Sequence, residues 1–161
     1  MSVQTIQINY EVYATAQALP VVEQNLLLAA QEATFGSYAP YSNFFVGTAM
    51  LLANGQIIKG SNQENAAFPS GSCAEQSAIF WIGSNFPNVP ILAIVVIARQ
   101  GQNNEFKGVS PCGACRQAML EYEIRQQSPI RFLMLNAQNQ VFALQSIGDL
   151  LPFKFDNFKM L

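Results

Sequence analysis

The chain has 161 residues, of which 50% are hydrophobic and 11% are charged, and ten acidic against eight basic residues give a net charge of −2. This length predicts one domain with a sizeable core, and the composition excludes an intrinsically disordered chain. So few basic residues also exclude the strongly basic surface that binds nucleic acid or anionic membranes. The sequence contains three cysteines and no histidine. It therefore lacks Ser/His/Asp and Cys/His nucleophilic systems, histidine metal ligands and a disulfide framework.

Two features of the sequence bear on where the protein resides. No Lys or Arg precedes Lys59, which argues against a secretory signal with a basic start. The longest strongly apolar run, residues 91–98, is too short to cross a bilayer. We therefore expect a soluble protein in the reducing cytoplasm, with no membrane and no nucleic-acid partner.

In the first half of the chain the hydrophobic pattern predicts a strand, a helix and a hairpin. Apolar and polar residues alternate over 6–12, which is typical of a strand. Pro20 fits the first turn of a helix whose apolar residues follow at helical spacing as far as a stop at Gly36. The Asn54-Gly55 pair predicts a tight turn between strands at 44–52 and 56–59. Residues 60–72 form a polar loop.

The second half alternates helices with strands. We expect helices at 74–83 and 113–126, a strand buried on both faces at 91–98, and a strand pair at 130–135 and 140–144. Residues 101–110 are expected to be a surface loop, and Ser146 to cap a short last helix. The order predicts an α/β fold in which helices cover both faces of one sheet. We treat 1–161 as a single domain, with 1–20 as an N-terminal extension that could add an edge strand.

The three cysteines occur at two predicted helix starts. Cys112 and Cys115 form a C-x-x-C pair, and Cys73 precedes the other long internal helix. Helix N-termini stabilise thiolates, and three converging thiolates suit zinc. Because neither a fourth cysteine nor a histidine is present, the fourth position would stay open, as in catalytic zinc sites. Two alternatives remain: a redox pair, or cysteines that are simply buried small hydrophobic residues.

Glu75 is the acidic residue that stands beside this metal candidate. It follows Cys73 by two residues, so both side chains can face one metal only if Cys73 adopts a helix-cap conformation. In a chain without histidine, Glu75 is the best-placed proton carrier. The alternative is a glutamate that only stabilises the helix dipole.

These motifs resemble a known family. Cys73-Ala-Glu75 and Pro111-Cys112-Gly-Ala-Cys115-Arg116-Gln117 resemble the zinc signature of nucleoside deaminases. The chain is similar to small cytidine deaminases with three cysteine ligands over about residues 39–155. The similar region also includes Tyr41-Ser-Asn-Phe44-Phe-Val-Gly47, Gly60-Ser-Asn62-Gln-Glu64-Asn65-Ala-Ala and Leu150-Leu-Pro-Phe-Lys-Phe155.

The resemblance implies an α/β fold, a three-layer α/β/α sandwich with a mixed five-stranded sheet, and one zinc ion per chain. The implied reaction is hydrolytic deamination of cytidine and 2′-deoxycytidine to uridine and 2′-deoxyuridine plus ammonia, in pyrimidine salvage. By the same resemblance, Cys73, Cys112 and Cys115 hold the metal, and Glu75 moves the protons.

The resemblance also implies roles for residues around the substrate. The Phe44 ring packs on the base, Asn62 and Glu64 bond the ribose hydroxyls, and the Ala74 N–H holds the pyrimidine carbonyl. A homotetramer is implied, in which Phe155 reaches into a neighbouring subunit's site. From the residues alone, Phe44 would ordinarily be a core residue, Asn62 a turn residue and Glu64 an exposed side chain.

One departure from the family pattern concerns charge. Relatives with three cysteine ligands commonly carry Arg after the catalytic Glu, whereas this chain has Gln76. We therefore hypothesise that Arg116 offsets the thiolate charge. A deaminase of another aminopyrimidine nucleoside, such as blasticidin S, and a non-catalytic zinc-stabilised binding module remain alternatives.

Overall fold

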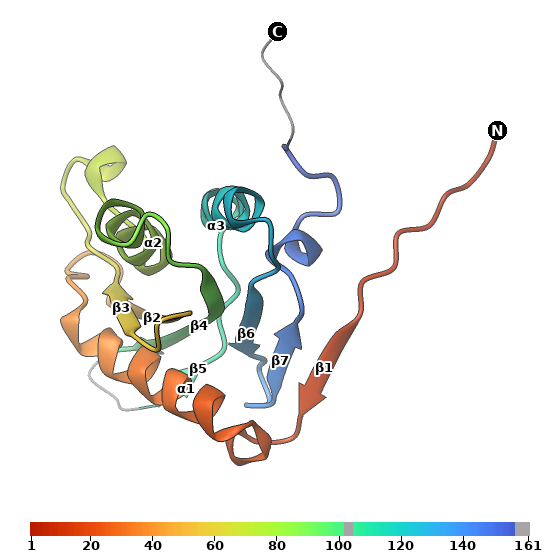
Figure 1. The fold of residues 1–161 in the computed structure, drawn as a ribbon. Coiled ribbons are helices and arrows are strands. Elements are labelled where there is room, and N and C mark those ends of the chain that lie inside the picture. Colours follow the sequence, from red (N-terminus) through yellow and green to blue (C-terminus); the bar gives the residue numbers. More distant parts are fainter. Residues whose placement is uncertain (102–104, 157–161) are drawn as a thin grey trace, which may run out of the picture.

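The computed structural model describes residues 1–101 and 105–156 (Figure 1). It contains one seven-stranded sheet with the strand order β1-β7-β6-β4-β2-β3, in which β5 also pairs with β4. The strands are β1 (Tyr10–Tyr13), β2 (Phe44–Leu52), β3 (Ile57–Ser61), β4 (Ile91–Gln100), β5 (Phe106–Lys107), β6 (Arg131–Leu135) and β7 (Val141–Leu144). The helices are α1 (Val21–Ala33), α2 (Ala74–Asn85) and α3 (Gly113–Gln126), with short 3-10 helices η1 to η4 at Ala16–Ala18, Thr34–Gly36, Phe68–Ser70 and Ile147–Leu150.

The sheet is mixed, and its central strand is β4. This strand runs antiparallel to β2 on one side and parallel to β6 on the other. Its residues Ile94 to Ala98 are fully buried, which confirms the strand buried on both faces. Side chains of β4 alternate between two cores: Ile94 and Val96 belong to one, and Val95 and Ile97 to the other.

Helices cover both faces of the sheet. Figure 1 shows α1 on one face and α2 beside α3 on the other. The core under α1 includes Leu26 and Ala30, whereas the core under α2 and α3 includes Ile79 and Met119. The predicted three-layer α/β/α sandwich is therefore confirmed. Among the helices of the described residues, none is long and apolar enough to cross a membrane.

The sheet has two strands beyond the five that the resemblance implies. The first, β1, pairs antiparallel with β7 from Tyr10 to Tyr13 and is shorter than the predicted 6–12 strand, because Tyr10 already lies opposite Leu144, where β7 ends. The second, β5, lies in the segment 101–110, which was wrongly expected to be only a loop. Strand β4 continues beyond its pairing with β6, and β5 pairs with this extension at Ala98 and Arg99.

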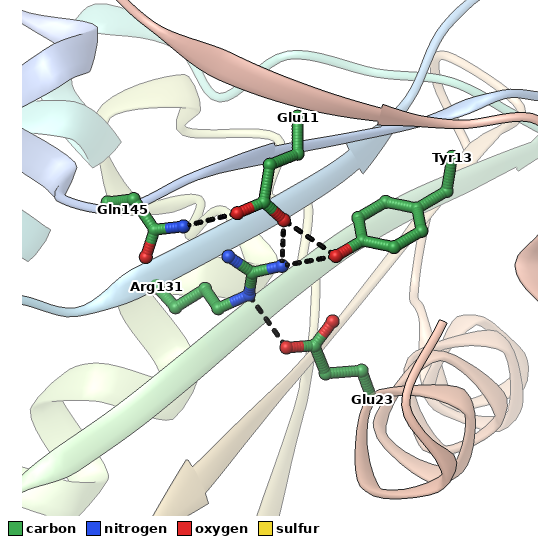
Figure 2. Close-up of polar contacts among 5 residues, drawn as sticks. All are labelled: Glu11, Tyr13, Glu23, Arg131 and Gln145. Atoms are coloured by element: carbon green, nitrogen blue, oxygen red, sulfur yellow. Dashed lines mark hydrogen bonds and ion pairs between the residues drawn. The ribbon is translucent and has the colours of Figure 1, made fainter. Parts of the chain in front are cut away.

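Side chains also hold β1 in place (Figure 2). Arg131, at the start of β6, forms ion pairs of 2.7 Å with Glu11 of β1 and with Glu23 of α1. The same guanidinium donates to the Tyr13 hydroxyl at 3.1 Å, and Gln145 donates to Glu11. Arg131 therefore connects the N-terminal strand, the first helix and the sheet.

Candidate functional site

The three cysteines converge where α2 and α3 begin. Cys73 is the N-cap of α2, Cys112 is the N-cap of α3, and Cys115 lies in the first turn of α3. The three Sγ atoms lie within 4.8 Å of one another, and those of Cys73 and Cys112 are 3.9 Å apart. None of the three forms a disulfide. The two predicted helix starts that carry the cysteines therefore lie together, as a site of three converging thiolates requires.

The spacing of the sulfur atoms fits zinc. Zinc–sulfur bonds of about 2.3 Å in a tetrahedron place two sulfur atoms about 3.8 Å apart, close to the observed Cys73–Cys112 separation. Cys115 is buried, Cys73 is half-buried and Cys112 is exposed. The cluster therefore has a protein-covered side and an open side, which suits a zinc ion with three protein ligands and a free fourth position.

The thiols influence one another. The pKa of Cys73 is lowered to about 6, chiefly because the Cys115 side chain hydrogen-bonds to its sulfur. The pKa of Cys115 is raised by the same interaction and by burial. The cluster thus favours negative charge on Cys73, as expected for a thiolate at the start of a helix.

Glu75 lies beside the cysteines and is almost completely enclosed. Its exposed fraction is 4%, and burial raises the pKa of its carboxyl group. The preceding Cys73 has an extended backbone, with φ −70° and ψ 155°, which is the cap conformation that the sequence argument required. Both residues consequently line the same cavity, whereas two positions this close within a helix would face apart.

That cavity has a volume of about 660 Å³. It brings together most of the residues predicted for the site. Those on its walls are Phe44, Asn62, Glu64, Cys73, Ala74, Glu75 and Cys112. Further wall residues to which sequence reasoning gave no role in the site include Tyr41, Ser42, Val109 and Ser110.

Asn62 secures the beginning of β2. Its side-chain amide donates to the Phe44 carbonyl at 3.0 Å and accepts from the Val46 N–H at 2.8 Å. This pairing fixes the backbone that carries the Phe44 side chain. Among the described residues these two bonds leave one N–H and one oxygen lone pair of the amide for another partner.

Glu64 is bound by the turn that precedes β2. Its carboxylate accepts hydrogen bonds from the backbone N–H of Tyr41 at 2.9 Å, from the N–H of Ser42 at 3.3 Å and from the Ser42 hydroxyl. The Ser42 hydroxyl and the Tyr41 N–H lower the pKa of this carboxyl group. The sequence offers a signal only for the local bond of Ser42, because a serine hydroxyl can accept the N–H of the residue two positions later, here Phe44.

Three predicted residues are not among the described residues that line the cavity: Cys115, which is buried, Arg116 and Phe155. Arg116 donates to the Pro111 carbonyl at 2.9 Å and to the Leu150 carbonyl at 3.1 Å, so it joins the start of α3 to η4. Phe155 has a 65% exposed side chain, and its carbonyl accepts from Gln117 at 3.0 Å. Within one chain, Arg116 and Phe155 both bear on how the C-terminal segment is attached to α3.

Comparison with known proteins agrees with this geometry. Residues 21–128 match the family model of the cytidine and deoxycytidylate deaminase zinc-binding region. The chain belongs to the cytidine and deoxycytidylate deaminase family. The matched segment contains all three cysteines and Glu75, whereas β1, which includes Glu11, precedes it.

Individual relatives extend this result. The chain is 32% identical over 141 residues to the cytidine deaminase of Mycobacterium tuberculosis, which covers 85% of this chain and 92% of that protein. It is 42% identical over 98 residues to the cytidine deaminase of Halalkalibacterium halodurans, covering 61% and 70%. The crystal structure of cytidine deaminase from Burkholderia pseudomallei is similar with a TM-score of 0.69 and 36% identity, covering 81% of this chain and 97% of that one.

Proposed function

We propose that the protein catalyses the zinc-dependent hydrolytic deamination of cytidine and 2′-deoxycytidine, giving uridine or 2′-deoxyuridine and ammonia, in pyrimidine salvage in the cytoplasm. The observation that carries this proposal is the cluster of three cysteine sulfur atoms, two of whose residues, Cys73 and Cys112, line the same cavity as the enclosed Glu75. Residues 1–161 act as a single domain, with one zinc ion held by Cys73, Cys112 and Cys115.

When bound, zinc supplies a Lewis acid that makes a water molecule acidic enough to attack C4 of the pyrimidine at neutral pH. Glu75 accepts a proton at its carboxylate and delivers protons to N3 and to the departing amino nitrogen. Its enclosure beside the sulfur atoms keeps the carboxyl away from bulk solvent, so protons pass between water and substrate. The products balance: cytidine and water give uridine and ammonia.

The rest of the cavity suits a nucleoside. Its volume of about 660 Å³ lies in the range common for small-molecule sites. Phe44 offers a ring to the base, and Asn62 and Glu64 offer hydrogen-bonding positions to the sugar hydroxyls. The N–H of Ala74 lies in the first turn of α2, where backbone N–H groups lack intrahelical acceptors, and we assign it to the pyrimidine carbonyl.

We assign to Arg116 the role of offsetting the negative charge at the metal site. Three thiolates and a zinc dication leave a net charge of −1, which weakens the effect of the metal on water. Arg116 directly follows Cys115 and is held by two backbone carbonyls, so its charge stays near the start of α3. Gln76 lies on α2 and carries no charge.

We also propose a homotetramer in which Phe155 completes a neighbouring subunit's site. Large apolar side chains are exposed on α2, where Phe80 and Trp81 are 53% and 47% accessible. Trp81 lines a groove against the edge strand β3, a combination typical of protein interfaces. Sedimentation analysis tests this proposal, with an expected mass four times the 17.7 kDa of one chain.

The substrate is tested by incubating the zinc-loaded protein with cytidine, 2′-deoxycytidine and blasticidin S. We expect uridine, 2′-deoxyuridine and ammonia from the first two compounds, and little product from the third. If blasticidin S alone reacts, the protein is a deaminase of that antibiotic. If one zinc is bound per chain and no compound reacts, the protein is a zinc-stabilised binding module.

A further inference from the structure

Two carboxylates in this protein are bound by a serine in the same way. Ser42 donates its hydroxyl hydrogen to Glu64 and accepts the N–H of the residue two positions later. Ser146 does the same: it donates to Glu123 at 2.6 Å and accepts from the N–H two positions later at 3.0 Å. The two arrangements differ in how many other hydrogen-bond donors contact the carboxylate.

Glu123 has all of its hydrogen-bonding capacity filled within the protein. One oxygen accepts from the N–H groups of Ile130 and Ile147, both at 2.8 Å. The other accepts from the Ser146 hydroxyl and the Gly148 N–H. A carboxylate offers about four lone-pair positions, so none is left over. This carboxylate joins α3 to η4 and has no further ligand to bind.

Glu64 has one position left. Oε2 accepts from the N–H groups of Tyr41 and Ser42, and Oε1 accepts from the Ser42 hydroxyl. Within residues 1–101 and 105–156 no fourth donor reaches the carboxylate. Glu64 lines the cavity that contains the cysteines, whereas Glu123 does not. On Glu123 the corresponding lone pair of Oε1 accepts from the Gly148 N–H. On Glu64 a hydroxyl group of a bound ligand can therefore donate to the free lone pair of Oε1.

We propose that Ser42 is a positioning residue for the substrate sugar, acting through Glu64. Its hydroxyl and N–H hold opposite oxygens of the carboxylate, which fixes the rotation of the carboxylate plane and directs the remaining lone pair of Oε1 to the cavity. The same hydroxyl accepts the Phe44 N–H at 3.1 Å, so the sugar-binding carboxylate and the aromatic wall residue are set by one group. This inference rests on the proposed function, because it takes a nucleoside as the ligand.

The test measures product binding by calorimetry, with uridine and with 2′,3′-dideoxyuridine, which lacks the hydroxyls that Glu64 can accept from. Ser42→Ala should raise the Kd for uridine roughly three- to tenfold, the effect of losing one hydrogen bond of ordinary net strength. The Kd for 2′,3′-dideoxyuridine should change by less than about twofold. Ser42→Thr, which keeps a hydroxyl, should restore most of the uridine affinity.

Two further variants separate positioning from a structural role. In a Glu64→Ala background, Ser42→Ala should cause no additional loss of uridine affinity, because Ser42 acts through that carboxylate. The matched control is Ser146→Ala, which removes the same two kinds of hydrogen bond outside the cavity and should leave the ratio of the two Kd values unchanged.

Several results would overturn the positioning role. These are an unchanged Kd for uridine in Ser42→Ala, an equal rise for both ligands, or a rise that persists in the Glu64→Ala background. The proposed function is judged separately, since failure of the wild-type protein to convert cytidine would overturn deamination even if the binding differences hold. A wild-type protein that does not bind uridine would overturn both.

Discussion

Strand β3 packs closely against the start of α2, and this contact allows a sharp test. A Cβ atom on Gly60 would stand 2.4 Å from the Ala74 carbonyl oxygen, 2.8 Å from Ala78 Cβ and 2.9 Å from Ser77 Oγ. The first two are fixed to the helix backbone, so Gly60→Ala must move the beginning of α2 away from β3 by at least about 0.6 Å, which brings the 2.4 Å distance to 3.0 Å. Cys73 moves with it, because it caps this helix.

Overpacking of this kind costs about 1–3 kcal/mol of unfolding free energy. We expect urea denaturation to show a loss of that size for Gly60→Ala, together with weaker zinc retention against a chelator. Gly113→Ala is the matched control, because Gly113 lies between two proposed zinc ligands and a Cβ there meets no atom within 4 Å. In the first turn of α3 this change should leave stability equal or raise it by up to about 1 kcal/mol. A Gly60→Ala protein as stable as the wild type, with unchanged zinc retention, would refute the argument.

Three further predictions concern the metal, the N-terminal strand and Arg116. Cys112→Ala should lower the zinc content from one ion per chain to near zero by atomic emission, and full retention would contradict the ligand set. The pKa of Glu11 is lowered from 4.5 to about 2 by Arg131, so its contribution to stability is complete above pH 4.5 and lost as the pH falls toward 2. Glu11→Gln should accordingly be less stable than the wild type at pH 7, and urea titrations should show the difference shrinking between pH 4.5 and 2; a constant difference would exclude this linkage. Arg116→Ala should lower turnover about 10–100-fold, as for other residues that adjust a metal's ligands, and undiminished turnover would show that Arg116 only holds Pro111 and Leu150.

Local signals predicted most of the fold because they set element boundaries directly. The strand at 44–52 and the helix at 113–126 have the predicted bounds. The Asn54-Gly55 pair ends the first, and Gln127 in a left-handed conformation ends the second. The ends of strands β1 and β5 could not be predicted from such local signals. Their extent depends on where distant strands β7 and β4 offer a free edge, which the local pattern does not contain.

In the site, too, local features could be predicted from the sequence and long-range contacts could not. The cysteines and Glu75 were predictable because few residue types can hold zinc or carry a proton, and the sequence contains few of them. The hydrogen bonds of Ser42 to Glu64 and of Asn62 to Val46 could not be predicted, because the partners lie 22 and 16 positions away in the sequence. For Arg116 the motif indicated proximity to the thiolates but gave no sign of its bonds to backbone carbonyls.

The central claim is that three cysteines hold zinc while Glu75 carries the protons of the reaction. The most direct test compares the wild-type protein with Glu75→Gln, measuring zinc content and uridine formation from cytidine in the same samples. We predict one zinc ion per chain in both proteins, with turnover in the variant lower by about 10²–10⁴-fold, the usual contribution of a general acid–base group. Turnover in Glu75→Gln equal to that of the wild type, with zinc retained, would contradict the claim.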